Sequence, residues 1–142
     1  MSKKKTIACC IICKNEEALI GRALESVKWV DNIYVCDTGS IDGTLEVVKK
    51  YTQNICLSFV WTDNFADAQN HCKSHAKEDW ILSLDSDEVL LSTEAEVREA
   101  VEQAKDVVRF HMVAEGAKTD FGFGRLFRNS PDIYWVSAIH KH

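Results

Sequence analysis

The sequence predicts an α/β fold in which a mainly parallel sheet is covered by helices on both faces. Two features support this: short apolar runs alternate with segments whose apolar residues recur every three or four positions, and polar clusters follow the apolar runs. Continuous apolar runs are typical of strands buried on both faces, and their alternation with helices is typical of right-handed βαβ units. The 142 residues fit a single domain of common size.

Strands and helices are expected to alternate along most of the chain. Strands are expected over residues 6–13, 32–37, 55–60, 80–84 and 107–114. Helices are expected over residues 16–29, through Leu45, Val48 and Tyr51, over residues 65–76, and after a Thr93-x-x-Glu96 capping box. The part from 115 to 142 breaks this rhythm. Short strands or extended segments are expected there, as an antiparallel addition to the edge or floor of the sheet.

The overall charge and the first residues restrict the possible partners. A net charge of −5 disfavours duplex nucleic acid, because neutralising phosphates needs a basic surface. The start MSKKKTIACCIICKNEE has lysines before an apolar run, as signal peptides do, but no small-residue cleavage site follows. The run is also too short to span a bilayer. We therefore expect a cytoplasmic protein with at most peripheral membrane contact.

The six cysteines lie mostly in apolar segments, and Cys10 and Cys13 form the single Cys-x-x-Cys pair. Zinc would need four ligands, and a strand directs Cys10 and Cys13 to opposite faces. Free thiols that behave as small core residues are therefore the preferred interpretation, which agrees with a reducing compartment.

Ligands of open parallel sheets bind beyond the carboxyl ends of the strands, so the residues that follow each strand are candidates for a site. Asp85 and Asp87 follow the fourth expected strand and are two positions apart, so they point to the same side of an extended chain and Ser86 to the other. This arrangement suits a hard cation such as Mg²⁺ or Mn²⁺. The alternative is a solvated acidic turn.

The loop DTGSIDGT follows the second strand and contains two glycines. Asp42 is expected to cap the next helix. Asp37 closes an apolar strand, where its carboxylate could accept the N–H of a uracil, thymine or guanine ring; adenine and cytosine lack that imide donor.

Three blocks of the sequence, ACCIICKNEEALIGRALESV, VDNIYVCDTGSIDGTLEVV and FADAQNHCKSHAKEDWILSLDSDEVL, resemble successive blocks of the family-two glycosyltransferases with the GT-A fold. The tail RLFRNSPDIYWVSAIH is similar to the block that ends the donor half in a branch resembling bacterial lipopolysaccharide-core sugar transferases. Together these blocks span almost the whole chain in the family's order.

The resemblance implies a single nucleotide-sugar-binding domain that uses Mn²⁺ or Mg²⁺ and a nucleotide-diphosphate sugar, with UDP-sugar expected. Its implied donor-site residues are Cys13, Glu16, Asp37, Gln69, Asp85 and Ser86. Asp85 and Asp87 match the family's Asp-x-Asp motif, in which the final aspartate ligates the metal and the first faces the ribose or sugar. His140 matches a histidine that completes the metal shell in related enzymes.

Family-two enzymes are inverting, which implies in-line attack by an acceptor hydroxyl and a carboxylate as general base. Glu115 and Asp120, after the fifth expected strand, are the candidates for this base. Gln69 stands where the family often has an arginine, and the chain stops two residues after His140, where relatives continue. A C-terminal truncation is therefore expected. The alternative is a non-catalytic or assembly-dependent donor-binding module, with a homo-oligomer among the possible assemblies.

A nucleotidyltransferase would share the sheet and the carboxylate–metal chemistry. It would carry a glycine-rich, basic phosphate loop after the first strand, and CKNEEA supplies neither glycines nor several positive charges. The nucleotidyltransferase interpretation is therefore disfavoured.

Overall fold

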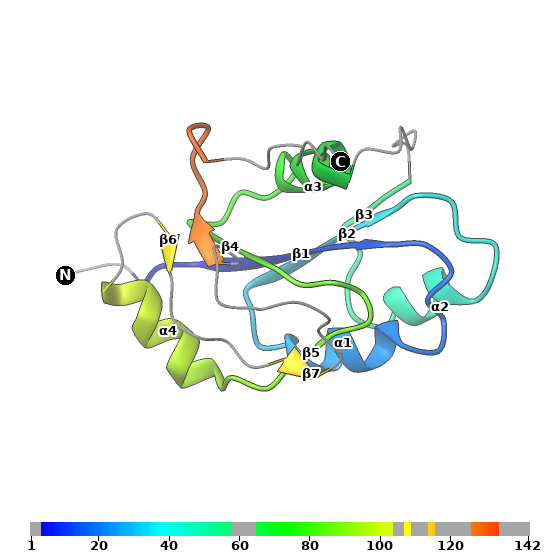
Figure 1. The fold of residues 1–142 in the computed structure, drawn as a ribbon, viewed down its shortest axis with the longest axis horizontal. Helices are drawn as coiled ribbons and strands as arrows, with labels where there is room; N and C mark the ends of the chain where they lie inside the picture. The colour runs from blue at the N-terminus through cyan, green and yellow to red at the C-terminus, as the bar shows by residue number, and fades with distance from the viewer. Residues whose placement is uncertain (1–3, 58–64, 104–106, 109–113, 116–125, 134–142) are drawn as a thin grey trace, which may run out of the picture.

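The computed structural model describes residues 4–57, 65–103, 107–108, 114–115 and 126–133. In this part of the chain the main sheet has the strand order β3-β2-β1-β4-β8-β6 (Figure 1). Its strands are β1 (Ile7–Cys13), β2 (Asn32–Asp37), β3 (Ile55–Cys56), β4 (Trp80–Ser83), β6 (Val107–Val108) and β8 (Leu126–Arg128). A separate two-stranded sheet pairs β5 (Val89–Leu90) with β7 (Ala114–Glu115).

The first four strands of the sheet are parallel, as the alternating pattern predicts. β1 pairs in parallel with both β2 and β4, and β2 pairs in parallel with β3. β8 is antiparallel to both β4 and β6. The antiparallel addition is therefore present, but it lies inside the sheet, between β4 and β6, and not at its edge. The α/β fold class predicted from the sequence is confirmed.

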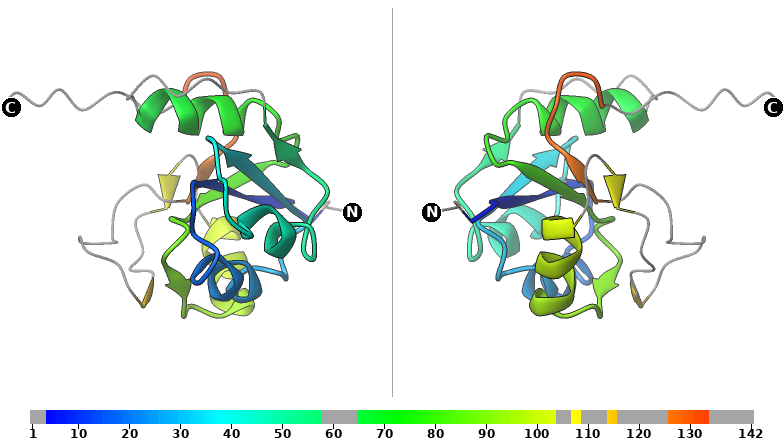
Figure 2. Two further views of the ribbon diagram at one scale, coloured as in Figure 1. Left: turned by 90° about the vertical axis from the view of Figure 1, so that its right-hand side faces the viewer. Right: turned by 90° about the vertical axis from the view of Figure 1, so that its left-hand side faces the viewer.

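Helices cover both faces of the sheet. α3 (Phe65–Lys73) lies on one face, and α1 (Ile20–Ser26), α2 (Thr44–Val48) and α4 (Glu94–Gln103) lie on the other (Figures 1 and 2). Alternate residues of β1 enter two separate cores: Ile7, Cys9 and Ile11 pack on the side of α1, and Ala8 and Cys10 on the side of α3. This double burial explains why the β1 sequence is continuously apolar.

All six cysteines are free, and all but Cys56 are buried. Cys10 and Cys13 belong to different cores, on opposite faces of the sheet, as the strand geometry predicts. None of the helices in the described residues combines the length and the apolar character that crossing a membrane requires.

Several element boundaries differ from the sequence-based expectations. α1 begins at Ile20 and not at residue 16, because the preceding residues form turns that contact the loop after β2. β3 comprises Ile55 and Cys56. Leu57, also within the expected range, is not part of the strand, and residues 58–60 lie outside the described part of the chain. The expected strand 107–114 is wrong as one element, because β6 and β7 belong to different sheets.

The capping box at the start of α4 is present. Thr93 donates its backbone N–H to Glu96 Oε1 at 2.8 Å, and Glu96 donates its N–H to Thr93 Oγ1 at 3.2 Å. Thr93→Ala should therefore lower the free energy of unfolding by about 1 kcal/mol, measured by chemical denaturation. Glu102→Ala, at an exposed position late in α4, is the control and should change it by less than about 0.5 kcal/mol. Equal stabilities for the two variants would contradict the capping role.

Candidate functional site

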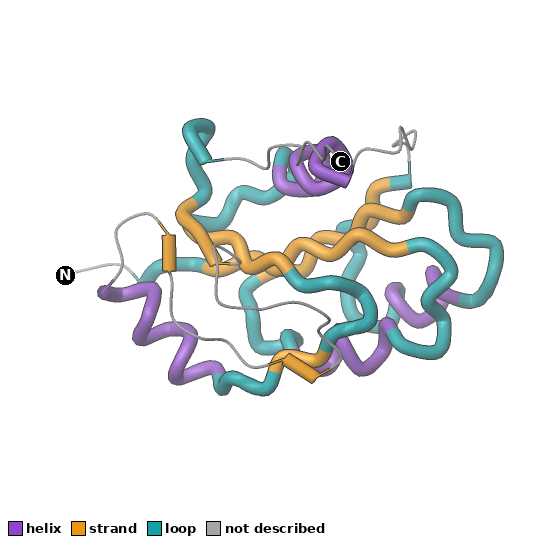
Figure 3. The backbone as a smooth tube through the Cα atoms, in the orientation of Figure 1, coloured by secondary structure: helices purple, strands orange, loops and turns teal. Residues whose placement is uncertain are grey.

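A cleft lies at the carboxyl ends of β1, β2 and β4, the edge of the sheet at which the sequence predicts a ligand site. In Figure 3 the loops that follow β1 and β2 lie at the same end of the sheet. The cleft has a volume of about 360 Å³ and is lined by Ile12, Cys13, Lys14, Glu16, Thr38, Asp85, Ser86 and Asp87. It therefore gathers most of the predicted donor-site residues together with the predicted metal ligand Asp87.

Negative charge predominates in this cleft. Glu16, Asp85 and Asp87 contribute carboxylates, and Lys14 contributes an ammonium group. Asp85 and Asp87 are both half-buried, so their carboxylates repel each other in partly desolvated surroundings unless a cation neutralises them. A set of carboxylate oxygens suits a hard divalent cation such as Mg²⁺ or Mn²⁺ better than a soft one.

The acidic turn after β4 is held by its third carboxylate, Glu88. This side chain is buried, with 2% of its surface exposed, and accepts the backbone N–H of Asp85 at 2.9 Å. The backbone N–H of Glu88 in turn donates to the carbonyl of Asp85 at 3.0 Å. Glu88 thus fixes the turn that presents Asp85 and Asp87 to the cleft.

The sequence-based prediction gave Glu88 no function in the site. A usable signal was present: Glu88 stands three positions after Asp85, the spacing at which a capping-box glutamate reaches back to a backbone N–H.

Asp37 lies behind the cleft and does not line it. Its Oδ2 accepts the backbone N–H groups of Gly39 and Ser40 at 3.3 and 3.0 Å, and its Oδ1 accepts the Ser40 hydroxyl and the Cys13 thiol. A carboxylate offers about four lone-pair positions, so these contacts occupy them all. Burial, reinforced by the neighbouring Asp37 carboxylate, raises the pKa of the Cys13 thiol, which therefore remains a donor.

The segment after β1 is joined to the loop after β2 by reciprocal hydrogen bonds, which we call the loop clasp (residues 15–17 with 40–44). Asn15 donates its N–H to Ser40 Oγ at 2.8 Å, and Asn15 Oδ1 accepts the N–H of Ile41 at 2.8 Å. The N–H of Glu16 donates to Thr44 Oγ1, also at 2.8 Å. Asn15 has a positive φ of 53°, a conformation that asparagine adopts more readily than most residues.

The loop clasp also orders the start of α2. Glu17 Oε1 accepts the N–H of Gly43 at 3.0 Å, and a Cβ added at Gly43 would meet the Glu17 carboxylate at 2.7 Å, so only glycine fits there without displacing Glu17. Asp42 accepts the N–H of Thr44 at 3.0 Å. Asp42 thus satisfies the helix terminus as expected, although Gly43 occupies the N-cap position itself.

The other predicted site residues lie elsewhere or beyond the described part. Gln69, on α3, is buried and donates from Nε2 to Ser83 Oγ at 3.4 Å, and it is not among the residues that line the cleft. Glu115 lies on β7 with its backbone opposite Val89. Asp120 and His140 fall outside the described residues.

Relatives with curated sequences come from several bacteria. The chain is 35% identical over 143 residues to a TPR repeat-containing protein of Synechococcus elongatus, which covers 95% of this chain and 34% of that protein. It is 30% identical over 93 residues to the lipopolysaccharide core biosynthesis glycosyltransferase LpsC of Rhizobium meliloti, which covers 63% of this chain and 34% of LpsC. The chain thus spans about a third of the length of these relatives.

Solved structures share the fold at low sequence identity. S. aureus TarS 1–349 in complex with UDP matches with a TM-score of 0.58 and 22% identity, over 69% of this chain and 32% of TarS. The M. tuberculosis glucosyl-3-phosphoglycerate synthase in complex with Mn²⁺, UDP and glucosyl-3-phosphoglycerate matches with a TM-score of 0.53 and 22% identity, over 60% of this chain and 34% of the synthase. Both are GT-A glycosyltransferases.

The family described as Glycosyl transferase family 2 matches this chain over residues 8–134, a range that includes every residue lining the cleft. The mostly parallel sheet flanked by helices agrees with the fold of the GT-A neighbours. The chain therefore belongs to glycosyl transferase family 2, as its sequence blocks predict, and has the GT-A fold.

Proposed function

We propose that this chain is the donor-binding domain of a metal-dependent, inverting glycosyltransferase that transfers a sugar from a UDP-sugar to an acceptor hydroxyl. The observation that carries the proposal is the presence of Asp85 and Asp87 in one cleft with Lys14 and Glu16, at the carboxyl ends of β1 and β4. A cytoplasmic location agrees with six free cysteines.

The family assignment supports nucleotide-sugar chemistry. Structures of S. aureus TarS contain UDP or UDP-GlcNAc, and one structure of the M. tuberculosis synthase contains Mn²⁺ with UDP. The acidic cleft supports the binding of a divalent cation and a diphosphate by this chain. The cation would neutralise both the carboxylates of the cleft and the diphosphate.

In this proposal Asp87 is the principal metal ligand, Asp85 contacts the metal or the donor's ribose or sugar, and His140 completes the metal shell. Bound Mn²⁺ or Mg²⁺ would supply Lewis-acid stabilisation of the charge that grows on the leaving diphosphate. Glu88 positions Asp85 through its backbone N–H. Gln69 acts indirectly through Ser83, the last residue of β4.

The uracil base is proposed to bind beside Cys13 and Glu16, with Asp37 accepting its imide N–H. Because four donors already surround the Asp37 carboxylate, the base must displace one of them. The Cys13 thiol, at 3.5 Å, is the weakest of these donors and is the one that also lines the cleft. Ser86 borders the same space.

Inversion requires one in-line step. The acceptor oxygen bonds to the anomeric carbon as the bond to the diphosphate breaks, and the acceptor's proton passes to a carboxylate base. Glu115 is the preferred candidate for this base. The pairing of β5 with β7 brings its backbone opposite Val89, two positions after Asp87. Asp120 is the alternative candidate.

Mn²⁺ should tighten UDP binding to this chain. Asp87→Asn should remove that metal-dependent part, because it halves the charge of the Asp85 and Asp87 pair and removes an anionic ligand. Isothermal titration with UDP, with and without Mn²⁺, measures both effects. Asp132→Asn, at an exposed carboxylate, is the control and should behave as the parent chain does. Equal UDP affinity of the parent chain with and without Mn²⁺ would contradict the metal assignment.

UDP should bind about 10–100-fold more tightly than CDP, since a hydrogen bond to a charged group contributes about 1.5–3 kcal/mol and cytosine lacks the imide donor. Asp37→Asn should bring the ratio of the two affinities close to one. A role of Asp37 limited to supporting its loop would instead weaken UDP and CDP equally and leave the ratio unchanged. Competition binding at fixed Mn²⁺ measures this ratio.

Glu88→Ala should weaken the Mn²⁺-dependent part of UDP binding by about 10–100-fold, the range found for residues that orient metal ligands. Glu88→Gln should retain most of it, because an amide oxygen also accepts the N–H of Asp85. The same calorimetric titration compares the two variants. If alanine serves as well as glutamine, Glu88 does not act by positioning Asp85.

A screen of UDP-sugars and GDP-sugars for slow hydrolysis tests for chemistry at the donor. Release of UDP from one donor, dependent on Mn²⁺, is the expected result. Tight binding without hydrolysis of any donor would favour the non-catalytic donor-binding module.

A further inference from the structure

A second cluster of metal-binding side chains lies between β3 and α3, and it shares no residue with the donor cleft. It consists of Cys56 on β3, His71 on α3, and His75 in the turn that follows α3. The thiol and imidazole ligand atoms all lie within 4.8 Å of one another. The Cys56 Sγ and His71 Nε2 atoms are 3.0 Å apart.

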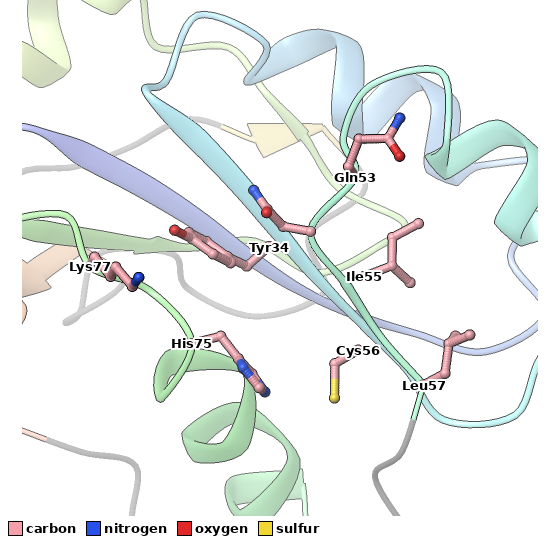
Figure 4. Close-up of a pocket in the computed structure, with 8 residues that line it drawn as sticks. Tyr34, Gln53, Ile55, Cys56, Leu57, His75 and Lys77 are labelled. Atoms are coloured by element: carbon pink, nitrogen blue, oxygen red, sulfur yellow. The ribbon is translucent and has the colours of Figure 1, made fainter.

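α3 and the turn that follows it supply two of the three groups. His71 and His75 are four positions apart, so they lie one above the other, with ring centroids 5.0 Å apart and ring planes at 87°. Two histidines four positions apart on a helix are a recurring pair of zinc ligands. Figure 4 shows Cys56 of β3 and His75 of the turn after α3 on opposite sides of the same space.

The distances fit a small transition-metal ion. Zinc–sulfur and zinc–nitrogen bonds of about 2.3 and 2.0 Å place tetrahedral ligand atoms roughly 3.5 Å apart. The 3.0 Å between Cys56 Sγ and His71 Nε2 and the upper limit of 4.8 Å for all three ligand atoms bracket that value. One thiolate and two imidazoles are ligands that zinc prefers and that Mg²⁺ does not.

Solvent can reach the cluster from one side. Cys56 and His75 line a cavity of about 680 Å³, which also includes Tyr34, Asn54 and Lys77. Cys56 and His71 are half-buried, and His75 is exposed. A metal held by three protein ligands would therefore keep a fourth position open to water from this cavity.

We propose that Cys56, His71 and His75 bind one Zn²⁺ ion, with water as the fourth ligand. On binding, the Cys56 thiol releases its proton to solvent and both imidazoles bind as neutral rings. The ion joins α3 to β3, a strand of only two described residues that pairs with β2 alone in the main sheet. This site is independent of the donor cleft and of the proposed transferase activity.

The test uses the full 142-residue chain without a histidine tag, reduced and freed of metal with a chelator. Titration with Zn²⁺ against a chromophoric competitor should show one tight equivalent, and the melting temperature should rise with it. Co²⁺ in place of zinc should give a thiolate-to-cobalt charge-transfer band. Cys56→Ser should remove this band. His75→Ala should weaken zinc binding by at least about 100-fold, more than the loss of an outer-shell partner costs.

Two control variants separate this site from its surroundings. Lys77→Ala alters the same cavity without removing a ligand, and Asp87→Asn alters the donor cleft; both should retain the zinc affinity and the cobalt band of the parent chain. His75 is exposed, so its replacement should leave the fold intact, and circular dichroism verifies this. The proposal is overturned if the parent binds zinc no more tightly than His75→Ala, or if its Co²⁺ complex lacks the thiolate band.

Discussion

The donor cleft depends on the loop clasp, the reciprocal hydrogen bonding between the ends of β1 and β2. Where two parallel strands end, their backbone N–H groups lose their ladder partners and need others. Here the side chains of each segment accept the N–H groups of the other, through Asn15, Glu17 and Ser40 among others. The clasp thereby fixes the position of Glu16 and the wall of the cleft before any ligand arrives.

The acidic turn after β4 contains three carboxylates with different functions in the structure. Asp85 and Asp87 remain half-buried at the cleft, whereas Glu88 is buried and hydrogen-bonded to the backbone of the same turn. The burial of Glu88 is tolerable because the backbone N–H of Asp85 compensates part of its lost solvation. Within this turn, the carboxylates that line the cleft are therefore those of Asp85 and Asp87.

The sequence predicted correctly those elements that depend on neighbouring residues or on a strand being buried on both faces. β1 and β2 were recognised because both faces of each strand are covered, and the capping box because Thr93 and Glu96 are three positions apart. The insertion of β8 between β4 and β6 was missed, because it depends on pairing between residues about 48 positions apart, such as Trp80 and Arg128. No local pattern specifies such a partner.

The candidate site was predicted from the position of its residues after the strands and from the family resemblance, but the hydrogen bonds that support it were not predicted. Residues after the strands were gathered into one cleft because parallel strands end at one edge. Gln69 and Asp37 lie behind or beside this cleft, because helical and loop geometry direct their side chains to Ser83 and to the adjacent loop. The alternation of apolar runs and helical segments along the sequence carries no information about these side-chain hydrogen bonds.

The position of β8 also has a consequence for how the chain folds. β4 pairs with β1 on one side and with β8 on the other, and the described pairing of β6 is to β8. During synthesis, β1 to β4 can assemble from the first 83 residues, but β4 keeps one exposed edge until residues 126–128 emerge. An open, apolar edge is a template for intermolecular pairing. The last described strand therefore covers this edge of β4 and ends the interval in which the edge is exposed on the nascent chain.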